Sequence, residues 1–380
     1  MHHNISDDLN LLKEGIREFL RKEVEPLEAE HHDLIDTGEV NAAFFELCRQ
    51  IQRRSVAAGF HAMFMPEDVG GAGLGEFEMC IVREEVAQAG SHLAMLILGD
   101  LPFGPNKMLY HLATEDQRSK YLLPLCRGDA TTGIALTEPD AGSDLAAIKT
   151  KATLTDGGWL LNGTKHFISN APFADFLQVL ARDEGDGYSM FLVDRESYAL
   201  GAVQKSMGGD DIQGEVIFEN SFVPEANLIG EQGQAFRYAV EFLGNERLTM
   251  ASISTGMAEL ALRLMKAYAK ERVTFGKPII ENQAIQWMIA DSETELYAGR
   301  AMTYDAAQRA DAGENVFKEI SMAKLYCTEM VGRVVDRGVQ LFGGAGYMRG
   351  NKMERLYRLA RVLRIAGGSS EIQRMIIARS

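Results

Sequence analysis

The distribution of proline along the second half of the chain is the strongest constraint on the fold. After Pro224 the sequence contains one further proline, Pro278, so that 53 and then 102 consecutive residues lack this helix breaker. Within this stretch apolar residues recur three and four positions apart, as at Leu260 and Leu264. The pattern predicts several long helices that pack as a bundle over residues 231–380.

The first 130 residues also carry helical signals, which loops interrupt. Ser6 precedes an apolar series at helical spacing and can cap a helix that Glu25-Pro26 would end or kink. Residues 41–58 and 76–89 have the spacing of two more amphipathic helices, and the glycine-rich residues 65–73 between them predict a loop. We therefore predict an N-terminal helical domain over residues 1–130.

Residues 131–230 have a different pattern, in which short apolar runs alternate with turn residues. Strand signals cover residues 151–155, 159–161, 176–181, 188–193 and 215–218. Asp156-Gly157-Gly158 predicts a hairpin turn, and Asn162-Gly163 predicts a second tight turn. The predicted fold is thus mostly α with a central β domain. An N-terminal helical domain precedes a middle antiparallel β-sheet domain, and a four-helix-bundle domain follows it.

Charge, cysteine and histidine usage exclude several classes of protein. The net charge of −15 disfavours nucleic acid as a partner. No apolar run reaches the roughly 18 residues that membrane insertion needs, and the acidic N-terminus resembles no targeting signal, so we expect a cytoplasmic protein. The four cysteines form no CxxC pair and all eight histidines lie in the first half, so no metal site, disulfide framework or histidine-based hydrolase is indicated.

Two segments of the middle region end in hydroxyl and amide groups. Residues 137–144 (TEPDAGSD) follow an apolar run at 133–136, and residues 164–170 (TKHFISN) lie at the edge of another predicted strand. Exposed amides and hydroxyls at such turns suit a planar polar ring or a phosphate. Composition alone leaves open the plainer interpretation that both segments are ordinary strand ends.

Five segments in a fixed order together resemble the acyl-CoA dehydrogenase family. They are residues 137–144, 165–170, 272–278 (RVTFGKP), 340–347 (QLFGGAGY) and 367–374 (GGSSEIQR), and with them the resemblance covers nearly the whole chain. The resemblance implies the family's fold, which agrees with the order of regions predicted above. It also implies FAD as the cofactor, an acyl-CoA as the substrate, an electron-transferring flavoprotein as the partner, and a homo-oligomer, expected to be a tetramer.

The resemblance assigns cofactor contacts to residues of all five segments. In the middle domain the implied contacts are Ile134, Leu136, Thr137, Gly142, Ser143, Phe167, Ile168 and Ser169. Many members carry a tryptophan where this chain has Phe167. Phenylalanine keeps an apolar stacking face but lacks the N–H donor of the indole. In the last region the implied contacts are Arg272, Phe275, Gln283, Gln340, Gly343, Gly344, Ser369, Ser370 and Glu371. Several of these resemble residues that reach the FAD of a neighbouring subunit, which implies at least a dimer.

The predicted catalytic base comes from a departure from the commonest family pattern. Desaturation removes a proton from the α-carbon of the acyl group, so a carboxylate must reach that proton. Many members carry the glutamate where this chain has Gly367. Long-chain and isovaleryl-CoA dehydrogenases carry it before Arg-Leu on the helix that opens the C-terminal domain, where this chain has Glu246. We therefore predict Glu246 as the base, in preference to Glu241 and Glu371, while Gly367 keeps a backbone N–H for the thioester oxygen.

The substrate contacts that the resemblance implies are Ser143, Arg247, Gly367 and Gly368. Residues 205–215 depart from the family pattern and form either a shortened surface loop or a changed contact with CoA. The same fold hosts acyl-CoA oxidases, enoyl-CoA reductases and flavin monooxygenases, and Glu246 disfavours only the last, which need no such base. A non-catalytic protein that binds acyl-CoA or flavin is a further alternative.

Overall fold

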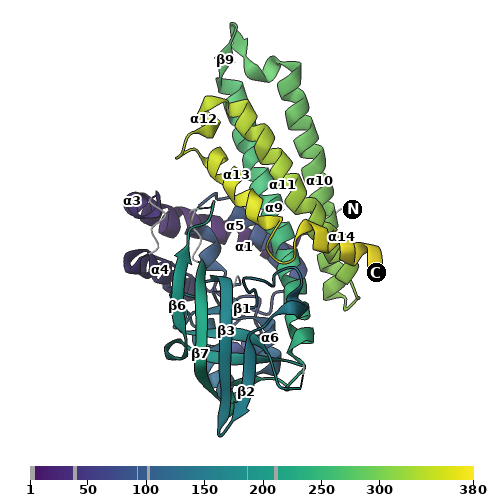
Figure 1. Cartoon of the computed structure of the whole chain (residues 1–380). Coiled ribbons are helices and arrows are strands. Elements are labelled where there is room, and N and C mark those ends of the chain that lie inside the picture. Colours follow the sequence, from purple (N-terminus) through teal and green to yellow (C-terminus); the bar gives the residue numbers. More distant parts are fainter. Residues whose placement is uncertain (1–4, 37–40, 92, 101–102, 186, 209–212) are drawn as a thin grey trace. The chain divides into compact units, whose positions relative to one another are not determined.

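The computed structural model describes residues 5–36, 41–91, 93–100, 103–185, 187–208 and 213–380 (Figure 1). The chain forms two compact units. One comprises Met1–Glu30, Gly75–Met95 and Gly244–Ser380, and is called the helical unit here; the other comprises His31–Leu74 and Leu96–Leu243, and is called the sheet unit. The predicted order of helical, β and helical regions is confirmed. The boundaries at residues 130 and 230 remain predictions, because each unit gathers segments from more than one predicted region.

The sheet unit holds all but two of the strands that the structure describes. Its helices are α3 (His32–Asp36), α4 (Ala42–Ala58), α6 (Lys107–Leu112), α7 (Glu115–Gln117) and α8 (Leu123–Cys126). Its strands are β1 (Thr132–Ala135), β2 (Lys151–Thr155), β3 (Gly158–Ser169), β4 (Phe176–Arg182), β5 (Tyr188–Asp194), β6 (Ala199–Gln204), β7 (Gln213–Pro224) and β8 (Leu228–Ile229). The strand order is β6-β7-β3-β2-β4-β5-β8, and β1 pairs with β4. Because β4 pairs with β1 and β2 in parallel, the predicted antiparallel sheet is in fact mixed.

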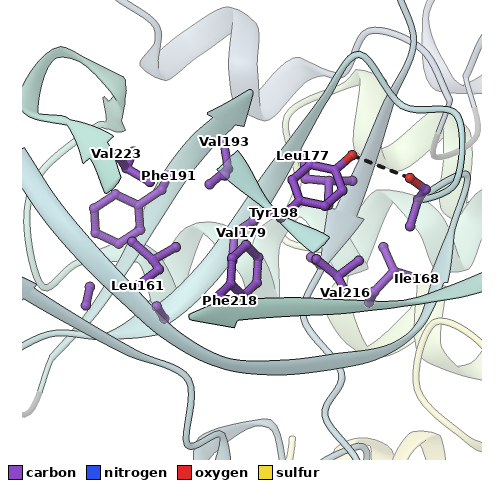
Figure 2. Packing of buried hydrophobic residues seen from close by; sticks show 14 of the residues in the cluster. Leu161, Ile168, Leu177, Val179, Phe191, Val193, Tyr198, Val216, Phe218 and Val223 are labelled. Atoms are coloured by element: carbon purple, nitrogen blue, oxygen red, sulfur yellow. Dashed lines mark hydrogen bonds between the residues drawn. The ribbon is translucent and has the colours of Figure 1, made fainter. Parts of the chain in front are cut away.

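Alternating side chains of these strands form one hydrophobic core (Figure 2). Successive side chains of a strand point to opposite faces, so every second residue of β3 can enter the core, as Trp159 and Leu161 do. The Trp159 and Phe191 rings meet edge to face, with their centroids 5.5 Å apart. The hydroxyl of buried Tyr198 donates to the carbonyl of Ala171 at 3.4 Å, so its polar end is satisfied within the core.

Strand β3 passes without interruption through Asn162 and Gly163, where the sequence predicts a tight turn. The register with β7 shifts between Leu161 and Gly163, which marks a bulge instead. Gly163 has φ +145°, and a Cβ there would lie 2.6 Å from Oγ1 of Thr150. The turn-like dipeptide is explained by this close backbone approach, which only glycine permits. The other predicted turn, at Asp156 and Gly157, does join β2 to β3.

The helical unit consists of long helices and one short hairpin. Its elements are α1 (Asp7–Phe19), α2 (Glu25–Glu30), α5 (Glu76–Ala87), the part of α9 (Ala235–Glu271) from Gly244 onward, β9 (Val273–Thr274), β10 (Lys277–Pro278), α10 (Gln283–Asp311), α11 (Phe317–Phe342), α12 (Gly344–Tyr347), α13 (Lys352–Leu363) and α14 (Ser370–Arg379). Ser6 caps α1, as predicted, by accepting the N–H of Leu9 at 3.2 Å. A π-helical turn, η1 (Leu20–Val24), leads directly into α2, so the chain stays helical through Pro26.

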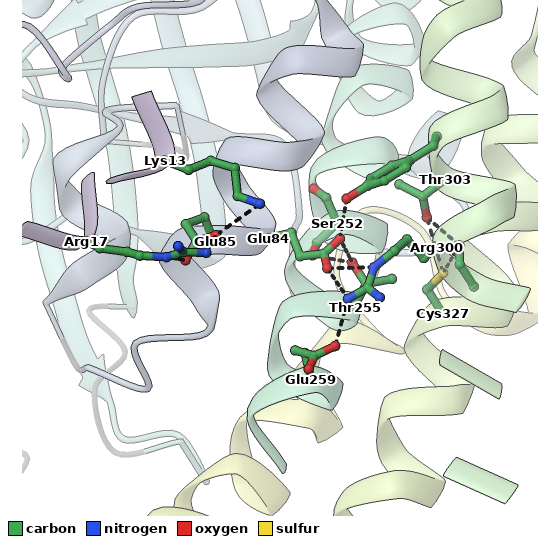
Figure 3. Close-up of polar contacts among 12 residues, drawn as sticks. Lys13, Arg17, Glu84, Glu85, Ser252, Thr255, Glu259, Arg300, Thr303 and Cys327 are labelled. Carbon is green, nitrogen blue, oxygen red and sulfur yellow. Dashed lines mark hydrogen bonds and ion pairs between the residues drawn. The ribbon is translucent and has the colours of Figure 1, made fainter. Parts of the chain in front are cut away.

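A buried carboxylate joins three helices of the helical unit (Figure 3). Glu84 on α5 accepts hydrogen bonds from Thr255 of α9 at 3.1 Å and from Tyr304 of α10 at 2.9 Å, and it pairs with Arg300 of α10. Arg300 also donates to Glu259 at 2.9 Å. A carboxylate is tolerated in the interior only with such partners, so this network selects how α5 packs on α9 and α10. Within the described residues, no helix is both long and apolar enough to cross a membrane.

The close backbone approach at Gly163 yields a stability prediction. We expect Gly163→Ala to lower the free energy of unfolding by about 2–4 kcal/mol, because the new Cβ adds a steric clash to an unfavourable backbone conformation. Gly157→Ala is the matched control, since Gly157 also has positive φ (+74°) but no atom within 4 Å of an added Cβ. Gly157→Ala should lower the free energy of unfolding by only about 1 kcal/mol. Urea unfolding monitored by tryptophan fluorescence measures both, and equal losses would contradict the clash.

Candidate functional site

One candidate site lies on the sheet unit, where β1 leads into the turn 137–144. Ala135 is fully buried, while Ile134 and Leu136 on either side of it are half-buried, because side chains alternate along an extended chain. Thr137 follows, and its carbonyl accepts the N–H of His166 at 2.9 Å. This bond places the turn beside strand β3, so the structure brings two of the predicted flavin-binding segments together.

Strand β3 contributes Phe167 and Ser169 to the candidate site on the sheet unit. Phe167 is 60% exposed, has φ +57°, and stacks its ring on His166 with the centroids 4.1 Å apart. A non-glycine residue in this conformation is strained, and such strain concentrates at ligand sites. Ser169 is half-buried, whereas the side chain of Ile168 is 2% exposed and belongs to the β core. The predicted cofactor contact of Ile168 is therefore restricted to its backbone.

A buried ion pair holds the turn against the sheet. Lys165 of β3 is fully buried, and its Nζ donates to Oε1 of Glu138 and to the carbonyl of Leu136, both at 2.9 Å. Glu138 also accepts the N–H groups of Lys149 and Thr150, at 2.5 Å and 2.9 Å. Burial opposes ionisation of Glu138, but Lys165 and these hydrogen bonds outweigh it, so the pKa of the carboxyl is lowered. Burial lowers the pKa of Lys165 to about 8.

Gly142 and Ser143 are exposed at the far end of the same turn. They lie beyond the part that Lys165 and Glu138 hold, in a position open to a ligand. The segment 205–215, whose contacts with CoA the sequence left in doubt, includes residues 209–212, which lie outside the described residues. Its two predicted alternatives therefore stay open.

A second candidate site, on the helical unit, is the turn between α13 and α14. Gly367 and Gly368 have φ +62° and +90°, a backbone conformation that glycine adopts without strain. A Cβ at Gly367 would lie 3.0 Å from the Sδ of Met250. The N–H groups of both glycines have no hydrogen-bond acceptor in the part of the chain that the structure describes. They are therefore available to an oxygen atom of a ligand.

Three buried side chains hold this turn by its carbonyl groups. Nζ of Lys324 donates to the carbonyl of Gly368 at 2.8 Å. Nε2 of Gln373 donates to the same oxygen at 2.9 Å and to that of Gly367 at 3.3 Å. Nε of Arg247 lies 3.5 Å from the Gly367 oxygen. All of these side-chain donors bind carbonyl oxygens of the turn, so none of them occupies its N–H groups.

Helix α9 carries both the predicted base, Glu246, and Arg247, which reaches this turn. Arg247 is 4% exposed and its guanidinium lies 4.9 Å from the ring centroid of Phe317. Burial lowers the pKa of Arg247. Glu246, the preceding residue of the same helix, is half-buried. The structure thus places a carboxylate one residue away from the arginine that contacts Gly367.

The hairpin of β9 and β10 carries two of the predicted cofactor contacts. Phe275 and Gly276 form its turn with φ +51° and +83°, and the Phe275 ring is fully exposed. Arg272 and Gln283, on either side of the hairpin, are exposed as well. An apolar ring in a strained and fully exposed position indicates contact with another molecule.

Gln340, Gly343 and Gly344 lie near this hairpin. Tyr268 of α9 stacks on Phe342 with a centroid distance of 4.3 Å, and β9 and α12 occupy the same end of the helical unit in Figure 1. Gln340 and both glycines are exposed. A Cβ added at either glycine would meet no atom of the described residues within 4 Å.

The remaining predicted cofactor contacts, Ser369, Ser370 and Glu371, lie at the start of α14 and differ in how deeply they are buried. Ser369 caps the helix through the N–H of Ile372 at 3.4 Å, and Glu371 is exposed. Ser370 is 4% exposed, and its hydroxyl donates to Glu329 at 2.7 Å. The side chain of Ser370 therefore stabilises the interior of the helical unit, which the sequence did not indicate.

Sequence reasoning did not select Lys165 or Lys324, the two buried lysines of the site. A signal was present for Lys324, because helical spacing puts it on the face of α11 that buries Cys327 and Val331. A lysine among buried positions needs a specific partner. A signal was present for Lys165 too, because it lies an even number of residues from Trp159 and Leu161 and so shares their buried face of β3.

Comparison with known proteins decides the family. The acyl-CoA dehydrogenase N-terminal, middle and C-terminal domain models match residues 6–129, 133–221 and 233–380. The chain belongs to the acyl-CoA dehydrogenase family. Members of this family are oxidoreductases that bind FAD. The fold and family expected from the five sequence segments are confirmed.

Relatives with different stated activities match over nearly their whole length. An acyl-CoA dehydrogenase of Bacillus subtilis is 34% identical, over 99% of this chain and 98% of the relative. Acryloyl-CoA reductase (NADH) of Anaerotignum propionicum is 35% identical, over 100% of this chain and 95% of the relative. Subunit CarC of the caffeyl-CoA reductase-Etf complex of Acetobacterium woodii is 34% identical, over 98% of each.

Solved structures agree with the fold. An acyl-CoA dehydrogenase from Geobacillus kaustophilus superposes with a TM-score of 0.90 at 31% identity, covering 100% of this chain and 99% of that one. An acyl-CoA dehydrogenase from Bacillus anthracis in complex with FAD has a TM-score of 0.89 at 28% identity, covering 99% of this chain and 67% of that one.

The residues that each unit exposes fit the chemistry of FAD. On the sheet unit, apolar Ile134, Leu136 and Phe167 lie with hydroxyl-bearing Thr137 and Ser169, which suits an aromatic ring with polar edges. On the helical unit, Arg272 is exposed and could pair with a pyrophosphate.

The buried pair of Lys165 and Glu138 yields a second prediction. We expect Lys165→Met to lower the free energy of unfolding by about 3–5 kcal/mol, because Glu138 loses its buried partner. Lys165→Met with Glu138→Gln should recover most of that loss, since no buried charge then remains. Because folding lowers the pKa of Glu138, the stabilisation by the pair is complete above the ordinary pKa of glutamate and is lost as the pH falls through the lowered value.

The exposed pair of Lys149 and Asp140, 2.8 Å apart on the same turn, provides the control. Lys149→Met should cause no measurable change in the urea unfolding midpoint. Equal effects of Lys165→Met and Lys149→Met would contradict the importance of burial.

Proposed function

We propose that the protein is an FAD-dependent acyl-CoA dehydrogenase that introduces a double bond between the α and β carbons of an acyl-CoA thioester. The observation that carries this proposal is that α9, the helix that bears Glu246, contacts through Arg247 a glycine turn without a carboxylate side chain. Arg247, next to Glu246, lies 3.5 Å from the carbonyl of Gly367. A carboxylate from α9 thus takes the role that a glutamate at position 367 has in other members.

The residues of the chain have distinct roles in this proposal. Glu246 accepts the α-proton, and the N–H of Gly367 binds the thioester oxygen on which negative charge develops. Thr137 and Ser169 bind the polar edge of the flavin, against which Phe167 supplies an apolar face. Bound FAD would supply the acceptor for the hydride that leaves the β-carbon. Ser143 and Gly368 contact the thioester arm of CoA.

Electrons leave the protein, in this proposal, through an electron-transferring flavoprotein. Support comes from the relative that is a subunit of a caffeyl-CoA reductase-Etf complex.

We further propose that the protein is a homotetramer in which subunits share FAD. Phe275, Tyr347 and Met348 are 103%, 77% and 61% exposed at the end of the helical unit that also carries Arg272 and Gln340. Exposed apolar side chains of this size, gathered beside predicted cofactor contacts, favour a subunit interface.

Substitution of the base tests the mechanism. We expect Glu246→Gln to slow anaerobic bleaching of the flavin by an acyl-CoA about 10²–10⁴-fold, because the amide cannot accept the proton. Glu241→Gln, an exposed glutamate of the same helix, is the control and should bleach at the normal rate. Normal bleaching by Glu246→Gln would show that another group is the base.

A substitution in the hairpin of β9 and β10 tests the proposed assembly of subunits. We expect Phe275→Ser to weaken FAD binding about tenfold or more and to shift the molecular mass towards smaller oligomers, since the ring is removed from the proposed interface. FAD titration and light scattering measure the two effects. Leu154→Ser on β2 is the control, because Leu154 is 56% exposed on the other unit. A fully assembled Phe275→Ser variant with normal FAD affinity would contradict the proposed interface.

A reductase of α,β-unsaturated acyl-CoA is the second candidate, which the acryloyl-CoA reductase relative favours. It predicts that saturated acyl-CoAs do not bleach the flavin, whereas an unsaturated acyl-CoA reoxidises the chemically reduced protein. Rapid reoxidation by oxygen would instead favour an oxidase, and binding of an aromatic compound without CoA a monooxygenase. A purified protein that cannot be loaded with FAD would favour a non-catalytic role.

A further inference from the structure

Two buried cations stand at the turn of Gly367 and Gly368 without a carboxylate partner. Lys324 is 0% and Arg247 4% exposed, and their nitrogen atoms approach the two glycine carbonyls at 2.8 Å and 3.5 Å. Neither cation forms an ion pair with a carboxylate in the described ranges. Nη1 of Arg247 is buried and has no hydrogen-bond partner there. Burial of such charges costs free energy, so a compensating role is expected.

Because of the geometry of the turn, these positive charges favour the binding of a negatively charged group there. Each cation is bound on the carbonyl side, and the N–H groups of the two glycines remain without an acceptor among the described residues. Preorganised donors in a positive field stabilise an oxyanion without further rearrangement. Position 367 adds no negative side chain, because it is glycine. Gln373 supports the same carbonyls but adds no net charge.

We propose that Lys324 is a positioning residue whose positive charge, with that of Arg247, prepares the Gly367–Gly368 turn to stabilise the enolate oxygen of the substrate. This inference rests on the proposed function. In the step concerned, the α C–H bond breaks, the proton goes to the carboxylate of Glu246, and the electron pair delocalises to the thioester oxygen. No further reactant is needed.

The charged groups around Lys324 make its contribution depend on pH. Burial, and then repulsion from Arg247 on α9, lower the pKa of Lys324 to about 8, while Glu329 of α11 and Glu371 of α14 oppose the shift. The ammonium group is therefore charged at neutral pH and loses its charge as the pH rises above about 8. An arginine at the same position would keep its charge throughout.

The test uses an acyl-CoA in which sulfur replaces the β-carbon. This compound can lose its α-proton but cannot give up a hydride, so its enolate accumulates beside oxidised flavin and produces a long-wavelength charge-transfer band. The band is titrated against pH in the holoproteins of the wild type, Lys324→Gln and Lys324→Arg. Lys318→Met is the control, because Lys318 lies on the same helix but donates to the carbonyl of Ser380.

We expect Lys324→Gln to raise the apparent pKa of the bound α-proton by about 1–2 units, which is about a 10- to 100-fold loss of enolate. Lys324→Gln keeps a hydrogen-bond donor, so this shift isolates the charge. Lys324→Arg should resemble the wild type near neutral pH and keep its band above pH 8, where the wild-type band weakens. Lys318→Met should match the wild type throughout.

Each other outcome has a defined meaning. An unchanged pH profile for Lys324→Gln, or an equal shift for Lys318→Met, overturns the role of Lys324. If Lys324→Gln does not fold, a wild-type band that persists above pH 8 as it does in Lys324→Arg overturns it as well. Absence of the band in the wild type contradicts the proposed α-proton abstraction itself, which separates the two proposals.

Discussion

A lysine ammonium group buried against a backbone carbonyl is the interaction on which each of the two candidate sites depends. In the sheet unit Lys165 binds the carbonyl of Leu136, and in the helical unit Lys324 binds that of Gly368. Each carbonyl belongs to a turn that carries predicted cofactor or substrate contacts. Because a buried ammonium group must satisfy its hydrogen bonds, it holds the turn in one conformation.

The two lysines differ in how their charge is compensated, and this difference separates their roles. Lys165 has Glu138 as a partner at 2.9 Å, so the pair adds little net field and serves mainly to hold the turn. Lys324 has carbonyl oxygen as its acceptor and Arg247 as a second cation nearby. Lys324 therefore has no carboxylate in direct contact among the described residues, beside the turn to which we assign the thioester oxygen.

The proposed exchange of a glutamate at position 367 for one at position 246 is compatible with the local geometry. The turn needs positive φ at both glycines, and a side chain at 367 would press on Met250. A carboxylate on α9 avoids both constraints, because Glu246 lies in regular helix. The turn then keeps only backbone groups, which suits it to bind an oxygen rather than to take up a proton.

The sequence by itself determined the order of helical, β and helical regions and the family. These follow from proline spacing, from alternation and from short ordered segments, which are local properties of the chain. Only the tertiary structure decided that Asn162-Gly163 lies at a bulge, that the side chains of Ile168 and Ser370 face the interior, and which distant groups Lys165 and Lys324 bind. Their positions depend on partners distant in the sequence, such as Thr150 for Gly163 and Gly368 for Lys324, and no local pattern specifies which distant group will be adjacent.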